Sequence, residues 1–159
     1  MPPTVGEPAP DFSLPAGPGP DRVTLSAFRG ERPVVLFFYP LAFSGVCTDE
    51  LCAVGERAGA WGELDAQVLA LSVDSPFVTR RFAGELGADF PLLSDFNREA
   101  TTAYDVVYDD FFGLKGVAKR AVFVVDRDGI LRYVWVTEDA DVLPDLDAVR
   151  SVLEQLAPA

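Results

Sequence analysis

A cysteine at the start of a predicted helix is the residue in this sequence best placed to do chemistry. Cys47 follows the apolar stretch 33–39 and ends the run Pro-Leu-Ala-Phe-Ser-Gly-Val-Cys, which is typical of a buried strand, a short loop and a first helical turn. We expect this helix to run from Cys47 to about Trp61. Unpaired backbone N–H groups and the positive end of the helix dipole favour a thiolate there. Because the thiolate is the nucleophilic form, the sequence predicts a reactive cysteine, although an inert buried thiol is the alternative.

The complete absence of histidine limits how that thiol could be activated. It excludes Ser-His-Asp and Cys-His catalysis, a histidine general base and any histidine-ligated metal. The only other cysteine is Cys52, and two cysteines cannot form a cysteine-rich zinc site. We therefore expect no metal and no cofactor, and activation by arginine, hydroxyl groups and backbone dipoles.

Three polar or conformationally restricted residues could assist Cys47. Ser44 lies three residues before it, so its hydroxyl could donate to a thiolate or a peroxide, or it could be an ordinary helix N-cap. Pro40 lacks an N–H group and would close the rim of a pocket, or simply end the strand. Arg120 begins the otherwise apolar segment 120–125, where it is either an edge residue or a cation directed into the site.

The spacing Pro-x-x-x-Ser-x-x-Cys that ends at Cys47 resembles the active-site pattern of the peroxiredoxin family, Pro-x-x-x-Thr/Ser-x-x-Cys. Segments 6–12 and 120–126 are also similar to that family, so the resemblance extends over nearly the whole chain. The phrase 39–47 resembles the alkyl hydroperoxide reductase E type. The Cys-x-x-x-x-Cys spacing to Cys52 resembles the bacterioferritin-comigratory, or Q-type, branch.

The resemblance implies a thiol-dependent peroxidase that reduces hydrogen peroxide and organic hydroperoxides. The Cys47 thiolate would attack the peroxide and become a sulfenic acid. Arg120 would stabilise both the thiolate and the negative charge on the leaving oxygen, and Glu50 would hold that guanidinium in place. Glu50 also suits a helix N-terminus without any catalytic role. A thioredoxin-like protein or a low-molecular-weight thiol would recycle the enzyme, and the family resemblance allows a homodimer.

Four apolar side chains could form a wall for the organic part of a hydroperoxide, although for most of them the sequence favours core packing. They are Phe38, Leu41, Phe43 and Phe112.

Cys52 is the predicted resolving cysteine, and its spacing sets a geometric condition. Helical residues five apart have Cα atoms about 8.7 Å apart, whereas a disulfide needs Cα atoms within about 7 Å. A Cys47–Cys52 disulfide therefore requires the first helical turns to unwind, which Gly45, Gly55 and Gly59 make easier. The alternative is a one-cysteine peroxidase in which Cys52 is packed as an apolar residue and an external thiol resolves Cys47.

Two other classes of function compete with a peroxidase. A thiol–disulfide oxidoreductase would share the fold but uses a Cys-x-x-Cys motif, which the sequence lacks. A non-enzymatic redox sensor or holdase would signal by unwinding the same helix. An assay of peroxide consumption with a supplied reductant separates these functions.

The charge balance and apolar pattern bear on partners and location. The 13 basic and 25 acidic residues give a net charge of −12, which argues against nucleic acid and anionic membranes as partners. This acidity fits either a high-salt cytoplasm or an ordinary solvated surface. No apolar run reaches the roughly 20 residues of a membrane span, and no signal peptide is visible, so we expect a cytoplasmic protein.

The pattern of strands and helices expected from the sequence predicts one α/β domain over residues 1–159. The resemblance implies a thioredoxin-like fold. The expected order is β-hairpin, β, α, β, α, β, α, antiparallel hairpin and α, which gives a mixed central sheet flanked by helices. The expected bounds are strands 11–14, 22–25, 34–39, 66–73, 90–93, 120–125 and 130–136, and helices 47–61, 76–87, 97–104 and 145–156.

Overall fold

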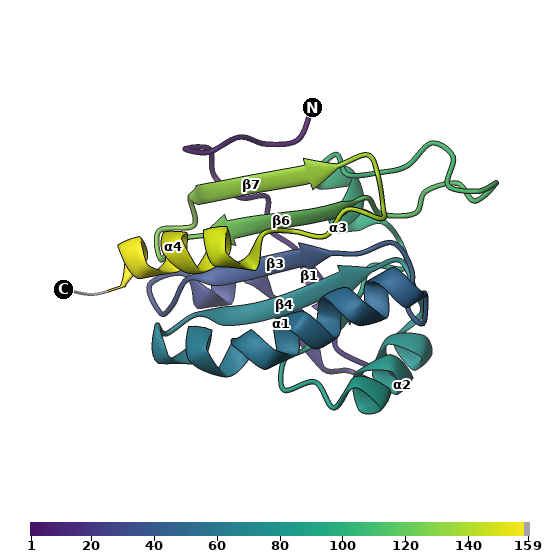
Figure 1. Cartoon of the computed structure of the whole chain (residues 1–159), viewed down its shortest axis with the longest axis horizontal. Helices are drawn as coiled ribbons and strands as arrows, with labels where there is room; N and C mark the ends of the chain where they lie inside the picture. The colour runs from purple at the N-terminus through teal and green to yellow at the C-terminus, as the bar shows by residue number, and fades with distance from the viewer. Residues whose placement is uncertain (158–159) are drawn as a thin grey trace.

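A five-stranded mixed sheet with the order β5-β4-β3-β6-β7 forms the centre of the computed structural model, which describes residues 1–157 (Figure 1). Strands β3, β4 and β5 are parallel, and β6 runs antiparallel between β3 and β7. The predicted mixed sheet is confirmed. Its strands are β3 (Val34–Phe38), β4 (Gln67–Ser72), β5 (Leu92–Ser94), β6 (Arg120–Val125) and β7 (Leu131–Thr137).

The predicted N-terminal hairpin is confirmed as a separate two-stranded antiparallel sheet. It consists of β1 (Ser13–Pro15) and β2 (Arg22–Thr24), which flank the Pro/Gly-rich turn. A 3-10 helix at Leu25–Phe28 follows it and was not predicted. A single turn of this kind has no apolar periodicity from which it could be recognised.

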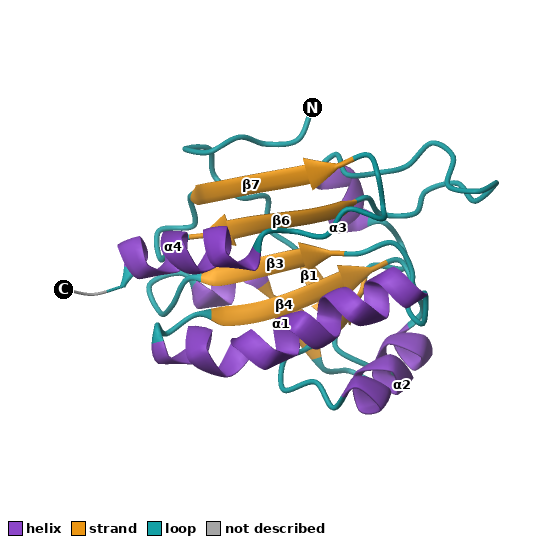
Figure 2. Cartoon of the chain, viewed as in Figure 1, coloured by secondary structure: helices purple, strands orange, loops and turns teal. Residues whose placement is uncertain are grey.

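Helices cover both faces of the sheet, as predicted (Figure 2). Helices α1, α2 and α4 pack on one face, and α3 lies on the other face together with the hairpin. The alternation of side chains along β3 separates the two cores, because Val35 and Phe37 point to one face and Leu36 and Phe38 to the other. The helices are α1 (Gly45–Glu63), α2 (Pro76–Leu86), α3 (Glu99–Ala103) and α4 (Leu146–Leu156).

The start of α1 differs from the prediction by two residues. Ser44 is the N-cap with extended backbone (φ −70°, ψ 149°), so Gly45 rather than Cys47 is the first helical residue. The carbonyl of Ser44 accepts from the backbone N–H of Thr48 at 2.9 Å, which closes the first turn. Cys47 therefore lies inside the first helical turn, where its backbone N–H is still one of the unpaired donors.

The register of the sheet brings the predicted site residues together. Phe38 pairs with Ala121, so Arg120 at the start of β6 lies beside the loop that follows β3. That loop leads directly into α1, which carries Cys47. The N-terminus of α1, the end of β3 and the start of β6 thus meet at one edge of the sheet. No helix within the described residues is long and apolar enough to cross a membrane.

Candidate active site

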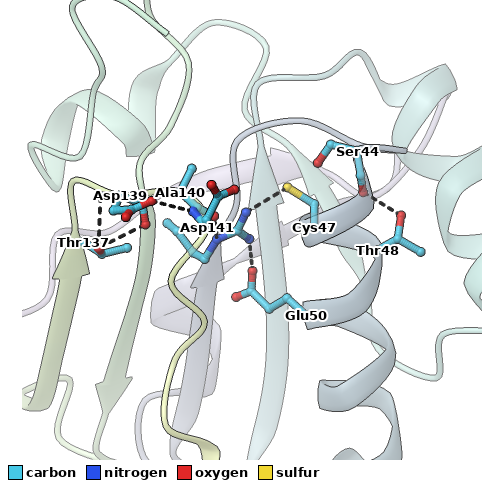
Figure 3. A network of polar contacts seen from close by, with 9 residues as sticks. Ser44, Cys47, Thr48, Glu50, Thr137, Asp139, Ala140 and Asp141 are labelled. Atoms are coloured by element: carbon cyan, nitrogen blue, oxygen red, sulfur yellow. Dashed lines mark hydrogen bonds and ion pairs between the residues drawn. The ribbon is translucent and has the colours of Figure 1, made fainter. Parts of the chain in front are cut away.

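The guanidinium of Arg120 connects Sγ of Cys47 to two other groups, and Figure 3 draws these contacts beside the labelled Cys47, Glu50 and Ala140. Its Nη2 donates to Sγ of Cys47 at 3.3 Å, and its Nη1 forms an ion pair with Oε2 of Glu50. Its Nε donates to the backbone carbonyl of Ala140 at 2.9 Å. All three nitrogens of the planar fork are therefore used, and only one orientation of the side chain satisfies them together.

Local structure explains why these side chains converge. Cys47 and Glu50 are three residues apart in α1 and therefore lie on the same face of the helix. Arg120 opens a strand whose six residues are all buried, so its side chain extends toward that face instead of toward water. Cys47, Glu50 and Arg120 are each about 1% exposed. The sequence analysis left open whether Arg120 was an edge residue, and the structure places it inside.

Burial and mutual charge act in opposite directions on this pair. Burial raises the pKa of Glu50 to about 7, although the Arg120 guanidinium beside it works to lower that pKa. Burial alone would lower the pKa of Arg120, but the negative charges of Glu50 and Cys47 outweigh it and raise that pKa. Arg120 therefore remains a cation at neutral pH. The second oxygen of Glu50, Oε1, is buried without a hydrogen-bond partner among residues 1–157.

A pocket of about 660 Å³ is lined in part by Cys47. Four of the six residues predicted for the site, namely Pro40, Ser44, Cys47 and Arg120, line it. Of the remaining ten lining residues, only Phe112 was predicted from the sequence, as part of an apolar wall. They are Gly45, Val46, Tyr108, Asp110, Phe111, Phe112, Glu138, Asp139, Ala140 and Asp141.

Pro40 and Ser44 occupy the two ends of the loop between β3 and α1. Pro40 is buried at the pocket wall, and Ser44 is exposed at the pocket mouth. Ser44 holds the N-cap position, yet its side chain makes no capping hydrogen bond. The purely structural interpretation of this hydroxyl is therefore weaker than the sequence suggested, because the capping bond that defines it is not formed.

A carboxylate that the sequence analysis overlooked fastens this loop. Oδ2 of Asp74, just after β4, accepts from the backbone N–H of Ala42 at 2.8 Å and from the Ser72 hydroxyl at 2.7 Å. Phe43, which follows Ala42 in the loop, has a left-handed backbone (φ 68°), which is uncommon for a bulky side chain. Its ring packs on Phe82 with centroids 4.9 Å apart. The loop is thus held by a hydrogen bond at Ala42 and by the ring contact of Phe43.

The other predicted apolar wall residues divide between the pocket and the core. Phe112 lines the pocket, whereas Phe38 packs in the core on the opposite face of the sheet. Leu41 and Phe43 are not among the lining residues. The aromatic wall of the pocket comes from the loop between α3 and β6, which projects from the end of the molecule (Figure 1). This loop carries Tyr108 and Phe111 as well as Phe112.

Cys52 lies in the same unbroken helix as Cys47 but faces solvent. Both cysteines are free, and the buried one and the exposed one point to different sides of α1. The expectation that Cys52 could be packed as an apolar residue is wrong, because the helix turns this position outward. The intact helix also meets the geometric condition derived above, under which the two sulfurs cannot bond without unwinding.

Residues 5–134 match the AhpC/TSA family. The chain belongs to this family. It is 40% identical to peroxiredoxin-2 of Bos taurus in an alignment 161 residues long, which covers 96% of this chain and 75% of that protein. It is 38% identical to alkyl hydroperoxide reductase E of Mycobacterium tuberculosis over 138 residues, which cover 87% of this chain and 88% of that protein.

Solved structures agree with the family assignment. The crystal structure of peroxidoxin BcpB from Mycobacterium tuberculosis matches with a TM-score of 0.83 at 30% identity, covering 97% of this chain and 98% of that chain. The thioredoxin-like fold implied by the sequence resemblance is confirmed. As a member of the AhpC/TSA family the chain is an enzyme, a thiol-dependent peroxidase whose substrates are hydroperoxides.

Several groups around the AhpC/TSA site gave little or no signal in the sequence. Asp74 could have been found, because polar residues that follow neighbouring parallel strands meet at one edge of the sheet. The carbonyl of Ala140 could not, because any residue type offers the same backbone oxygen. Within residues 1–157 no group of three or more Cys, Asp or Glu side chains is arranged to hold a metal ion.

Proposed function

We propose that Cys47 is the peroxidatic cysteine of this peroxidase and that it reduces hydrogen peroxide and organic hydroperoxides. The observation that carries the proposal is the hydrogen bond of 3.3 Å from the Arg120 guanidinium to Sγ of Cys47 at the base of a pocket. A cation next to a thiol at a helix N-terminus favours the thiolate, which is the reactive form.

The chemical step uses the groups around that sulfur. The Cys47 thiolate attacks the terminal oxygen of the hydroperoxide, so that an S–O bond forms as the O–O bond breaks. The leaving oxygen takes a proton and departs as water or an alcohol, and the sulfur becomes a sulfenic acid. Arg120 stabilises the charge that moves from sulfur to the leaving oxygen, and Glu50 fixes the guanidinium for this task. Ser44 donates to the bound peroxide, and Pro40 excludes water from the pocket wall.

We propose Cys52 as the resolving cysteine. Its thiolate attacks the sulfenic sulfur of Cys47, a disulfide forms, and hydroxide leaves and is protonated to water. Exposure of Cys52 supports this role because the side chain is accessible both to the sulfenic acid after local unwinding and to a reductant. A thioredoxin-like protein or a low-molecular-weight thiol then reduces the disulfide by thiol–disulfide exchange.

The second candidate is a one-cysteine cycle in which an external thiol attacks the Cys47 sulfenic acid directly. One observation favours it: α1 is continuous through both cysteines, so resolution by Cys52 requires helical hydrogen bonds to break. The two cycles share the first oxidation and differ only in whether an intramolecular disulfide forms.

A comparison of Cys47→Ser and Cys52→Ser tests the assignment. Stopped-flow tryptophan fluorescence with hydrogen peroxide should show no fast oxidation in Cys47→Ser and an unchanged first step in Cys52→Ser. Mass spectrometry of the wild type should find the Cys47–Cys52 disulfide, and Cys52→Ser should accumulate the sulfenic acid. Loss of the first step in both variants would refute the roles proposed here. A stable sulfenic acid in the wild type would select the one-cysteine cycle.

The cellular setting and organisation are part of the proposal. We place the enzyme in the cytoplasm because its cycle needs reducing thiols and both cysteines are free. The single domain and the homodimer remain predictions, and sedimentation velocity of the reduced and oxidised protein would measure the oligomeric state.

A further inference from the structure

Acidic side chains surround the mouth of the pocket above Cys47. Asp110, Glu138, Asp139 and Asp141 all line this pocket, and each of them is exposed. Arg120 is the only basic residue in the lining of the pocket, and Glu50 already compensates its charge. A substrate that approaches the sulfur therefore passes carboxylates before it meets the buried cation.

Three of these four carboxylates are free of a counter-charge. Lys119 pairs with Glu138 at 2.6 Å, so the charge of Glu138 is largely balanced. Within residues 1–157, no ion pair involves Asp110, Asp139 or Asp141. Lys115 belongs to the neighbouring loop and does not line the pocket.

The segment Glu138–Asp141 is held close to the reacting sulfur. Arg120 donates from Nε to the carbonyl of Ala140 at 2.9 Å, and the same guanidinium donates to Cys47, so the acidic segment and the sulfur share one anchor (Figure 3). Oδ1 of Asp139 accepts from the backbone N–H of Asp141 at 2.9 Å, which closes the turn. The backbone of this segment and the Asp139 carboxylate are therefore held in place at the entrance.

The phenol of Tyr108 indicates the sign of the local potential. Tyr108 lines the pocket and donates its hydroxyl to the carbonyl of Glu138 at 2.7 Å. Burial raises its pKa, and the charges of Glu138, Asp139 and Asp141 raise that pKa further, against the effect of Arg120. Adding a negative charge at this wall of the pocket is thus unfavourable.

The opposite property is offered by the aromatic wall. The rings of Tyr108 and Phe111 stack with centroids 5.0 Å apart, and Phe111 meets Phe112 at 4.9 Å. The Phe112 side chain is 91% exposed, so it has apolar surface available to a ligand. An alkyl or aryl group can gain contact here without bringing any charge to the entrance.

We propose that this rim makes the enzyme select uncharged hydroperoxides with an apolar substituent over hydroperoxides that carry a carboxylate. The inference rests on the proposed function, since it assumes that Cys47 reacts with hydroperoxides in this pocket. Coulomb repulsion from three uncompensated carboxylates at the entrance slows the reaction of a substrate anion about tenfold at low ionic strength. The effect is electrostatic, so salt screens it.

The test uses two probes of the same shape, cumene hydroperoxide and its para-carboxylate. Second-order rate constants are measured by stopped-flow tryptophan fluorescence and divided by the rates of each probe with free cysteine, which removes differences in intrinsic reactivity. We expect the normalised rate to favour the neutral probe about tenfold in about 0.01 M salt and to approach parity in about 1 M salt, where the screening length falls to about 3 Å.

The double substitution Asp139→Asn/Asp141→Asn removes two charges and keeps an amide oxygen that can accept the bond within the turn. It should reduce the preference for the neutral probe about fivefold at low salt, since two of three charges are gone. Asp89→Asn is the matched control, because Asp89 is exposed and precedes β5 at the opposite edge of the sheet. The control should leave the preference unchanged.

The outcomes separate the two proposals. Failure to consume hydrogen peroxide and both probes would refute the proposed function. Consumption of both at equal normalised rates, or a preference that neither salt nor the double substitution alters, would overturn the charge selection and leave the peroxidase intact.

Discussion

Arg120 and Glu50 form an ion pair whose two side chains are each 1% exposed. Burying two charges costs free energy that a good pairing geometry only partly returns, so such pairs add little to stability. Removing either partner would leave an uncompensated charge in the interior. The placement of this pair against Sγ of Cys47 gives the charge a chemical use, since perturbed ionisable groups are concentrated at functional sites.

The stability of this pair should depend on pH through Glu50. Burial raises its pKa from 4.5 to about 7, so between these values the folded protein binds more protons than the unfolded chain. The contribution of Glu50 to stability is therefore full below about pH 4.5 and is lost as the pH rises through 7, by up to about 3 kcal/mol. Urea unfolding of the wild type and Glu50→Gln across this range should show that the free energy of unfolding of the variant falls below that of the wild type by a growing amount as the pH is lowered.

The window is specific to this carboxyl. Asp89→Asn, which alters an exposed residue, should track the wild type throughout the range. A difference between Glu50→Gln and the wild type that is constant with pH would contradict the raised pKa of Glu50.

Replacement of Arg120 should reduce both the thiolate fraction of Cys47 and the rate of peroxide attack. Arg120→Met keeps much of the side-chain volume but removes the donor at 3.3 Å from the sulfur, and loss of one such donor typically slows a reaction about 100-fold or more. Thiolate absorbance against pH and stopped-flow kinetics measure the two effects. Arg120→Lys restores the charge without the planar fork and should recover the rate only in part. Unchanged titration and rate in Arg120→Met would exclude Arg120 from the site.

At the scale of elements, the loop between β3 and α1 depends on a neighbouring strand. Asp74 accepts the Ala42 N–H at 2.8 Å, next to Phe43 with its left-handed backbone. Asp74→Ala should lower kcat/KM for hydrogen peroxide about tenfold, since a hydrogen bond to a charged group contributes about 1.5–3 kcal/mol. Hydrogen exchange should show faster exchange of the Ala42 amide.

Asp74→Asn is the matched control for this loop because its amide oxygen can still accept from Ala42. Recovery of the rate and of the exchange protection in this variant would identify Asp74 as a positioning residue. Equal losses in Asp74→Ala and Asp74→Asn would instead point to the negative charge.

The first turns of α1 should unwind when the enzyme is oxidised. In the reduced protein α1 runs without interruption from Gly45, and a Cys47–Cys52 bond cannot form across about 8.7 Å. Hydrogen exchange should reveal loss of protection over residues 48–52 on oxidation, with protection retained in α4. Oxidised Cys52→Ser should keep the protection of the reduced form. Protection that persists in protein whose disulfide is confirmed by mass spectrometry would contradict the unwinding.

Two glycines in α1 allow the rate of that unwinding to be tested. A Cβ atom at Gly45 or Gly59 would meet no heavy atom within 4 Å, so alanine fits at both positions. Each substitution should stabilise the helix by about 0.5–1 kcal/mol. Gly45→Ala should slow disulfide formation several-fold because it lies in the unwinding segment, whereas Gly59→Ala should not.

At the scale of the whole molecule, the net charge of −12 should make stability depend on salt. Repulsion among like charges destabilises the compact state, and raising salt from about 0.01 M to about 1 M shortens the screening length from about 30 Å to about 3 Å. We expect sodium chloride to raise Tm at about pH 8. For a chain of this length, a gain of about 1 kcal/mol in the free energy of unfolding raises Tm by about 2–4 °C. The increase should shrink toward the isoelectric point near 4.2. An equal increase at all pH values would indicate a general salt effect.

Local sequence patterns predicted the element order and singled out Cys47 as the candidate reactive residue. A strictly apolar run such as β3 is a local signal, and so is the helix start at Ser75-Pro76. Both involve only neighbours in the chain, so they can be recognised without tertiary contacts. The spacing that ends at Cys47 is likewise local, as is the geometric obstacle to a bond with Cys52. The start of α1 was misplaced by two residues, because the N-cap is defined by the backbone of Ser44 and not by its side chain.

Only the tertiary structure decided how residues far apart in sequence meet around the sulfur. Arg120 had two interpretations until the register of β3 and β6 turned it toward α1. The helical phase that buries Cys47 also exposes Cys52, which overturned one interpretation of the second cysteine. The carbonyl of Ala140 and three of the four entrance carboxylates come from segment 138–141, whose sequence carries no local pattern, and Asp110 comes from the loop between α3 and β6. Their positions follow from long-range packing, which brings together groups that the linear chain keeps apart.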